Sequence, residues 1–317
     1  MLELLQSHWR IGALMALGAF ILALVPFYSS NYVISIFIVL YANIALATAW
    51  AFFSGTTRYI SLATAAFFGV GIYALAIFHV YVPVPLALLA AAIVGFLVAL
   101  VVGLSTLRLR GVYFVVFTFG LTELIHQVLN WWEIKINKTV SRYIFTDVSN
   151  VSIYETLLAV ALITIVGSWF VSKIRLGFAL RAIGEDETVA RHTGVNTTRV
   201  KVVCFALSAS VMALVGAVLA LRYSYIDATI AFNNTWSFQV LIAALLGGAG
   251  RAWGPAIGAI PLVLLSDFLA GTFPHHFGIA LGLCFVVIVY FLPGGLTRLL
   301  ERLYHAWWAE QTKVRTH

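Results

Sequence analysis

The chain is short of charged residues. Only 10% of its 317 residues are Asp, Glu, Lys or Arg, whereas 62% are hydrophobic and the mean hydropathy is +1.00. A water-soluble fold cannot bury this much apolar surface, so we expect an integral membrane protein. The ten-residue alternating segments of a membrane β-barrel are also missing, which leaves helices as the spanning elements.

Several functional motifs are absent as well. No glycine-rich loop of the G-x-x-x-x-G-K-S/T form occurs, so any ATP and Mg must be bound by other chains. The two cysteines, Cys204 and Cys284, match neither a metal spacing nor a disulfide framework, and no His, Asp or Ser cluster suits a membrane enzyme. The basic residues, which give a net charge of +7, are scattered at the ends of apolar runs. We therefore expect no catalytic site, no metal, no cofactor and no nucleic-acid partner in this chain.

Apolar runs long enough to cross about 30 Å of hydrocarbon recur along the chain. They predict an all-α integral membrane protein with about ten transmembrane helices, or eight to ten, in a single domain over residues 1–317. We treat the first run as uncleaved because no small-x-small site follows it, and the eighth is short enough to be re-entrant. The predicted spans are 9–28, 32–54, 61–81, 84–106, 112–130, 153–172, 200–221, 237–250, 254–271 and 277–292.

The basic residues also predict the orientation of the chain. If the N-terminus lies in the cytoplasm, 15 of the 19 Lys and Arg residues are cytoplasmic, and Lys135, Lys138, Arg142 and Arg222 are outside. The positive-inside rule therefore places both termini in the cytoplasm. In this frame residues 131–152 form a periplasmic loop and residues 173–198 a cytoplasmic loop.

The cytoplasmic loop has the pattern of two short helices, which we expect to be separated at Gly184. The second helix has acidic residues in its first turn and basic residues in its last, and Gly194 follows at the position of a left-handed C-terminal cap. One helical stripe could dock against a partner or against the bundle, or the segment could be only a solvated helical hairpin that joins two spans. Spacing leaves the docking stripe and the solvated hairpin equally open. This stripe consists of Leu176, Leu180, Ile183, Glu187 and Ala190.

Ionisable residues inside the predicted spans are few, and they are costly in a bilayer. Glu123, Gln127 and Asn130 lie at positions i, i+4 and i+7, with His126 beside them. We expect this polar row to point into the bundle, where it either lines the translocation path or forms a hydrogen-bonded clamp between helices. Asp267 is the other carboxylate at this depth.

Four blocks of sequence carry a resemblance to a known family. They are SLATAAFFGVGIYA from Ser61, LRLRGVYFVVFTFGLTELIHQVLN from Leu107, RAIGEDETVARHTGVNTTRVKVVCFALSASVMALVGAVLA from Arg181, and LLGGAGRAWGPAIGA from Leu245. The blocks resemble the permease subunits of the branched-chain amino acid ABC importers, in particular the LivM-like subunit. The third block is the most specific, because of its order of charges, glycine and following span.

The resemblance implies an importer-permease bundle with a cytoplasmic coupling helix that inserts into a groove on an ATPase subunit. It assigns the coupling role to Arg181, Glu185, Asp186, Glu187, Ala190 and Gly194. It also implies a bacterial inner membrane and several partners. These are a homologous second, LivH-like permease subunit, two ATP-binding-cassette subunits that hold ATP and Mg, and a periplasmic solute-binding protein.

The chain departs from the family pattern at two places. Ala63 and Thr64 stand where members usually have Gly-His, and residues 133–142 contain no glycine. We predict a permease that moves a small polar solute by alternating access, with a branched-chain or other amino acid as the default and urea, short amides or small carboxylates as alternatives. An ion-coupled secondary transporter is less favoured, because no convincing internal repeat occurs and only Glu123 and Asp267 could couple ions.

Overall fold

The computed structural model describes residues 22–26, 28–139, 141–291 and 295–298 of the chain. Most of these residues are helical. Two short strands, β1 (Arg142–Tyr143) and β2 (Tyr225–Ile226), pair antiparallel. The α-helices are α2 (Asn31–Trp50), α3 (Thr64–Phe78), α4 (Val84–Thr106), α5 (Val112–Trp132), α6 (Asn150–Lys173), α7 (Arg175–Glu185), α8 (Glu187–His192), α9 (Thr197–Ala220), α10 (Ala228–Ala231), α11 (Thr235–Gly247), α12 (Gly254–Thr272) and α13 (Phe277–Phe291). Short π-helical segments extend α2 (Ala51–Gly55) and α5 (Glu133–Asn137), and a 3-10 turn (Pro274–His276) precedes α13.

Among the described residues, seven helical segments are long and apolar enough to cross a membrane. They are Asn31–Gly55, Val84–Thr106, Val112–Asn137, Asn150–Lys173, Thr197–Ala220, Ala228–Gly247 and Gly254–Thr272, with two shorter apolar helices at Thr64–Phe78 and Phe277–Ile288. The expected all-α, multi-pass membrane class is therefore confirmed. The predicted span 9–28 lies largely outside the described residues, and both the count of about ten helices and the orientation stay predictions.

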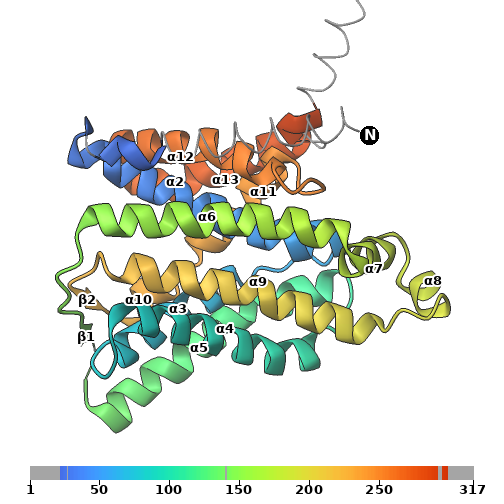
Figure 1. The fold of residues 1–317 in the computed structure, drawn as a ribbon, viewed down its shortest axis with the longest axis horizontal. Coiled ribbons are helices and arrows are strands. Elements are labelled where there is room, and N and C mark those ends of the chain that lie inside the picture. Colours follow the sequence, from blue (N-terminus) through green and yellow to red (C-terminus); the bar gives the residue numbers. More distant parts are fainter. Residues whose placement is uncertain (1–21, 27, 140, 292–294, 299–317) are drawn as a thin grey trace, which may run out of the picture.

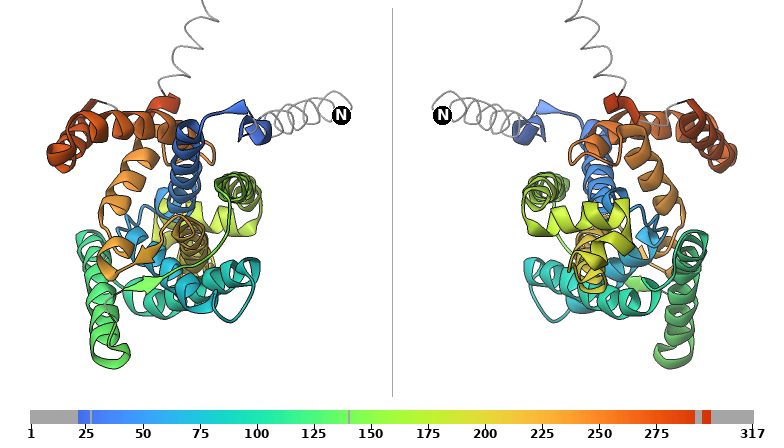
Figure 2. Two further views of the ribbon diagram at one scale, coloured as in Figure 1. Left: turned by 90° about the vertical axis from the view of Figure 1, so that its left-hand side faces the viewer. Right: turned by 90° about the vertical axis from the view of Figure 1, so that its right-hand side faces the viewer.

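Most helices run side by side in one bundle. Helices α7 and α8 lie at one end of it, and the β1–β2 pair lies at the other end (Figure 1). Viewed from the two ends, α5 and α13 lie at the periphery (Figure 2). Helix α9 packs against α3 and α4, which places it inside the bundle.

The centre of the bundle is built on close contacts between backbones. Helix α3 has 13 of its 15 residues buried, so other helices surround it along most of its length. A Cβ atom on Gly71 of α3 would overlap the carbonyl oxygen of Ala213 on α9, and one on Gly216 of α9 would overlap the carbonyl oxygen of Phe68. Small residues of this kind let membrane helices approach until their backbones touch.

Two details of the loops differ from expectation. The prediction that Gly184 separates two helices is wrong, because α7 continues through Gly184 and the break falls at Asp186, which is extended with φ −154° and ψ 112°. Gly184 serves close packing instead, since a Cβ atom there would overlap the carbonyl oxygen of Thr56. In the predicted outer loop 131–152, helical structure continues from α5 as far as Asn137.

Candidate functional site

Helix α8 is defined by a cap at each end. The Asp186 carboxylate accepts hydrogen bonds from the backbone N–H groups of Thr188 and Val189 at 2.7 and 3.1 Å, and these bonds hold the pKa of Asp186 below its usual range. At the other end Gly194 has φ +87°, and the N–H of Val195 donates to the carbonyl of Ala190 at 3.1 Å. The left-handed cap expected at Gly194 is therefore present.

Glu187 attaches α8 to the bundle. Its carboxylate accepts hydrogen bonds from Lys201 Nζ at 2.8 Å and from the Tyr59 hydroxyl at 2.7 Å. Lys201 Nζ also donates to the Tyr59 hydroxyl and to the carbonyl oxygen of Leu107, both at 3.1 Å, so all three ammonium protons have acceptors. The Lys201 and Glu187 side chains are only 4% and 10% exposed. We call Tyr59, Leu107, Glu187 and Lys201 the anchor cluster.

The charges around Glu187 favour its ionised form. Arg110 and Arg191 lie 3.4 and 3.6 Å from its carboxylate oxygens. Burial opposes ionisation, but the hydrogen bonds from Lys201 and Tyr59 outweigh burial and lower the pKa of Glu187 to about 2. Burial and the adjacent carboxylate raise the pKa of Tyr59 to about 12. At neutral pH the cluster is thus an ion pair bridged by a neutral tyrosine.

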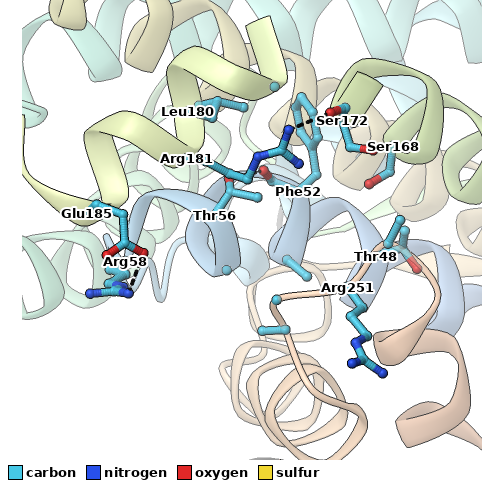
Figure 3. Close-up of a pocket in the computed structure, with 16 residues that line it drawn as sticks. Thr48, Phe52, Thr56, Arg58, Ser168, Ser172, Leu180, Arg181, Glu185 and Arg251 are labelled. Atoms are coloured by element: carbon cyan, nitrogen blue, oxygen red, sulfur yellow. Dashed lines mark hydrogen bonds and ion pairs between the residues drawn. The ribbon is translucent and has the colours of Figure 1, made fainter. Parts of the chain in front are cut away.

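Helix α7 has attachments of its own (Figure 3). The Arg181 guanidinium donates to the carbonyl oxygen of Ser172 at 2.9 Å, at the C-terminal end of α6, where a cation complements the helix dipole. Glu185 forms an ion pair with Arg58 at 2.8 Å, but both side chains are exposed, so this pair adds little stability. A cavity of about 370 Å³ lies between α7, the end of α2 and the turn at residues 249–252.

The six predicted coupling residues occupy different positions. Glu187 and Ala190 face the bundle, whereas Arg181, Glu185, Asp186 and Gly194 are exposed. The apolar part of the predicted stripe docks on the chain's own bundle, since Leu180, Ile183 and Ala190 are only 1–3% exposed. A contact between these residues and an ATPase stays a prediction. The outward face of α8 consists of Thr188, Val189, Arg191 and His192.

Most of the anchor cluster is not evident from the sequence. Lys201 lies near the start of an apolar span, so the positive-inside rule counts it among the cytoplasmic charges that predict the orientation. Its acceptors on Glu187, Leu107 and Tyr59 are 14, 94 and 142 residues away in the sequence. The available signal was its position within the hydrophobic helix α9, where a lysine needs a partner.

The predicted polar row lies on α5. Gln127 Nε2 donates to Glu123 Oε1 at 2.6 Å, and His126 Nδ1 lies 3.5 Å from the same oxygen. His126 also stacks on Phe232, with 6.1 Å between ring centroids, and Asn130 is half-buried further along the helix. The expectation that this row points into the bundle is wrong for Glu123 and Gln127, which are exposed, because α5 packs through a different face, Phe114, Thr118, Leu121 and Thr122. The Glu123 side chain is 56% exposed, so the other described helices leave much of the row uncovered. Its role in a translocation path stays a prediction.

Comparisons with known proteins agree on one family. The protein-family model described as "Branched-chain amino acid transport system / permease component" matches residues 32–292. The chain is 29% and 28% identical over 279 residues to the high-affinity branched-chain amino acid transport system permease protein LivM of Salmonella typhimurium and of Escherichia coli. Each of these matches covers 76% of this chain and 64% of the relative, so the chain spans somewhat less than two thirds of the LivM proteins it matches.

A second group of relatives carries a different subunit name. The chain is 31% identical over 145 residues to the permease protein LivH of Escherichia coli, which covers 44% of each chain. No solved structure matches the chain.

Proposed function

Because the chain belongs to the family of branched-chain amino acid transport permeases and is LivM-like, we propose that it is a membrane subunit of an ATP-binding-cassette importer. It moves a branched-chain amino acid, or a related small polar solute, across the bacterial inner membrane by alternating access. Both termini are cytoplasmic. ATP and Mg are bound by partner ATPase subunits, and this chain performs no catalysis.

The observation that carries the proposal is the anchor cluster. A short capped helix, α8, projects from one end of the bundle, and Glu187 connects it to Lys201 on α9, with Tyr59 and the carbonyl of Leu107 completing the contact. A rigid-body shift of α8 would therefore pass to α9 through buried charged contacts. In this mechanism the predicted coupling residues build and hold the helix, while its outward face meets the ATPase.

The proposed partners are a homologous second permease subunit, two ATPases and a periplasmic binding protein. The second permease subunit covers α5, whose polar row is poorly covered by the other helices that the structure describes. A carboxylate that faces hydrocarbon is costly, so the 56%-exposed Glu123 side chain favours an interface between subunits or a water-filled path. Glu123, His126, Gln127 and Asn130 then line the path between the two permease subunits.

The test is ATP-driven uptake. The chain is reconstituted into liposomes with its partner subunits, and uptake of radiolabelled leucine is measured with binding protein outside and ATP inside. We expect uptake to require hydrolysable ATP and to continue when ionophores collapse the ion gradients. Uptake driven by an ion gradient in the absence of ATP would contradict the proposal.

The coupling role is tested at two positions of α8. Glu187→Ala should leave assembly and ATP hydrolysis in place and abolish most uptake, because the helix loses its attachment to α9. Val189→Cys, in a background without Cys204 and Cys284, should cross-link to an ATPase subunit, since this side chain is 58% exposed on α8. Val116→Cys is the matched control, because Val116 is 64% exposed but lies on α5. Equal cross-linking from both positions would argue against α8 as the docking helix.

A further inference from the structure

A second cavity lies at the opposite end of the bundle from α7 and α8. Its volume is about 310 Å³, and its walls come mainly from α2 and α12. Tyr32 and Ser35, on the first two turns of α2, line this cleft, whereas the far end of the same helical segment reaches Gly184 of α7 through Thr56. Under the orientation proposed above, the cleft opens toward the periplasm.

The cleft carries one charge of each sign. Asp267 of α12 accepts a hydrogen bond from the Tyr32 hydroxyl at 2.7 Å, and Arg222, which follows α9, donates to Ser35 Oγ at 3.2 Å. Tyr32 and Ser35 are three residues apart on α2, so both charges contact the same end of this helix. Neither Asp267 nor Arg222 forms a salt bridge with another residue that the structure describes. Both charges can therefore accept a ligand.

Unpartnered polar atoms mark the deeper part of the cleft. Asn43 lines the cleft, is 1% exposed and uses its Nδ2 on the carbonyl of Val39, but its Oδ1 has no hydrogen-bond partner among the described residues. The hydroxyl of Ser266, beside Asp267, is also buried and has no partner in the part of the chain that the structure describes. A buried polar atom without a partner is costly, so these two side chains mark the place where a polar ligand would be stabilised.

The rest of the wall is mostly apolar, with Phe277 and one further polar side chain, Gln239. Ile36 and Val39 of α2 face the same cavity as Leu262 and Val263 of α12. A volume of this size is at the lower end for small-molecule sites, and an apolar wall with a few convergent polar groups is the usual composition of such a site. The wall suits a short branched hydrocarbon chain.

We propose that this cleft binds a zwitterionic amino acid with an aliphatic side chain. Asp267 receives the α-ammonium group, Arg222 receives the α-carboxylate, and Asn43 and Ser266 supply further hydrogen bonds. A simple cation would be repelled by Arg222 and a simple anion by Asp267, so the pair selects a ligand that carries both charges. The assignment of this ligand as transported solute rests on the proposed function, but the binding itself does not.

The experiment pairs ligand analogues with substitutions. The full chain is placed in nanodiscs of phosphatidylglycerol, and binding of radiolabelled leucine is measured in competition with leucinol, which lacks the carboxylate, and 4-methylpentanoate, which lacks the ammonium group. We expect Asp267→Asn and Arg222→Gln each to weaken leucine binding by about 10- to 100-fold, the range for loss of a hydrogen bond to a charged group. Asp147→Asn and Lys135→Gln, which change exposed charges outside the cleft, should leave binding unchanged.

The analogues make the result independent of folding defects. In Arg222→Gln, leucinol should bind at least as well as it does to the wild type, because the repelling charge is gone, and leucine should lose its advantage over leucinol. In Asp267→Asn, 4-methylpentanoate should bind at least as well as it does to the wild type, and leucine should lose its advantage over it. Wild-type preference ratios in both variants would overturn the proposal, as would the absence of saturable leucine binding at millimolar concentrations.

Two further outcomes separate this inference from neighbouring ones. The headgroup of phosphatidylethanolamine is also a zwitterion, so loss of leucine binding in nanodiscs that contain this lipid would overturn the proposal in favour of a lipid site. ATP-driven uptake with unchanged preference ratios would refute the cleft and leave the importer function standing. The predicted preference ratios together with ATP-independent uptake would support the cleft and refute the importer function.

Discussion

Lys201→Met is the most informative single perturbation of the coupling end, because it removes the ammonium group but keeps an apolar side chain of similar length. The wild-type ammonium contacts Glu187 at 2.8 Å and two further acceptors at 3.1 Å, and its side chain is 4% exposed. Removing one partner of a buried ion pair costs about 3–5 kcal/mol, because the other charge is left uncompensated. Arg110 and Arg191 remain near Glu187 at 3.4 and 3.6 Å, so we expect the lower end of that range.

The assay is the free energy of unfolding, measured by denaturant titration of the purified chain in micelles. Adding Glu187→Gln to Lys201→Met should recover most of the loss, because no buried charge then remains unpaired, and the coupling between the two substitutions should be about 2 kcal/mol. Lys173→Met is the matched control, since Lys173 is an exposed lysine in the last turn of α6 and should cost less than about 1 kcal/mol. If Lys201→Met costs no more than this control, the anchor cluster does not hold α8.

The remaining predictions concern α7 and α8. The pKa of Glu187 is lowered to about 2 in the folded chain, so the stabilisation from its ionised form is complete above its ordinary pKa and is lost as pH falls from about 4.5 toward 2. A fluorophore attached to Val189→Cys should report the release of α8 in this pH range. Glu187→Gln should remove the transition. Gly194→Ala forces a side chain into φ +87° and should cost about 1–2 kcal/mol, seen as faster proteolysis after α8, whereas Gly120→Ala, which meets no neighbour, should not. Gly184→Ala places a Cβ atom against a backbone carbonyl and should increase hydrogen exchange in α7.

The sequence predicts the helices well where hydropathy alone decides them. The membrane class follows from composition, and the local chemistry of α8 follows from residues that act on their own neighbours, such as Asp186 at its start and Gly194 at its end. These caps depend on contacts between residues two to five positions apart. Residue types and their spacing are therefore enough to predict both caps of α8.

Contacts between distant segments account for what the sequence did not reveal. A glycine such as Gly184 usually favours the end of a helix. Here glycine is required because the backbone of Thr56, far away in the sequence, packs directly against it. Lys201 has the position of an orienting charge at a membrane surface, yet it pairs with Glu187 in the interior. For the predicted stripe on α7 and α8, spacing leaves a docking stripe and a solvated hairpin equally open, since spacing shows that a face is apolar but not what covers it.

The contacts among α3, α4 and α9 limit how this bundle can move. Gly71 and Gly216 place backbone against backbone, and Gly95 of α4 leaves no room for a methyl group beside Ala213. If α9 turned about its own axis, side chains would replace glycines at these crossings, so α9 cannot turn while its neighbours stay still. The three helices therefore form a single stiff block, and α8 is attached to this block through the ion pair between Glu187 and Lys201. We expect a small tilt of α8 to tilt the whole block, with the largest displacement at the opposite end of the bundle.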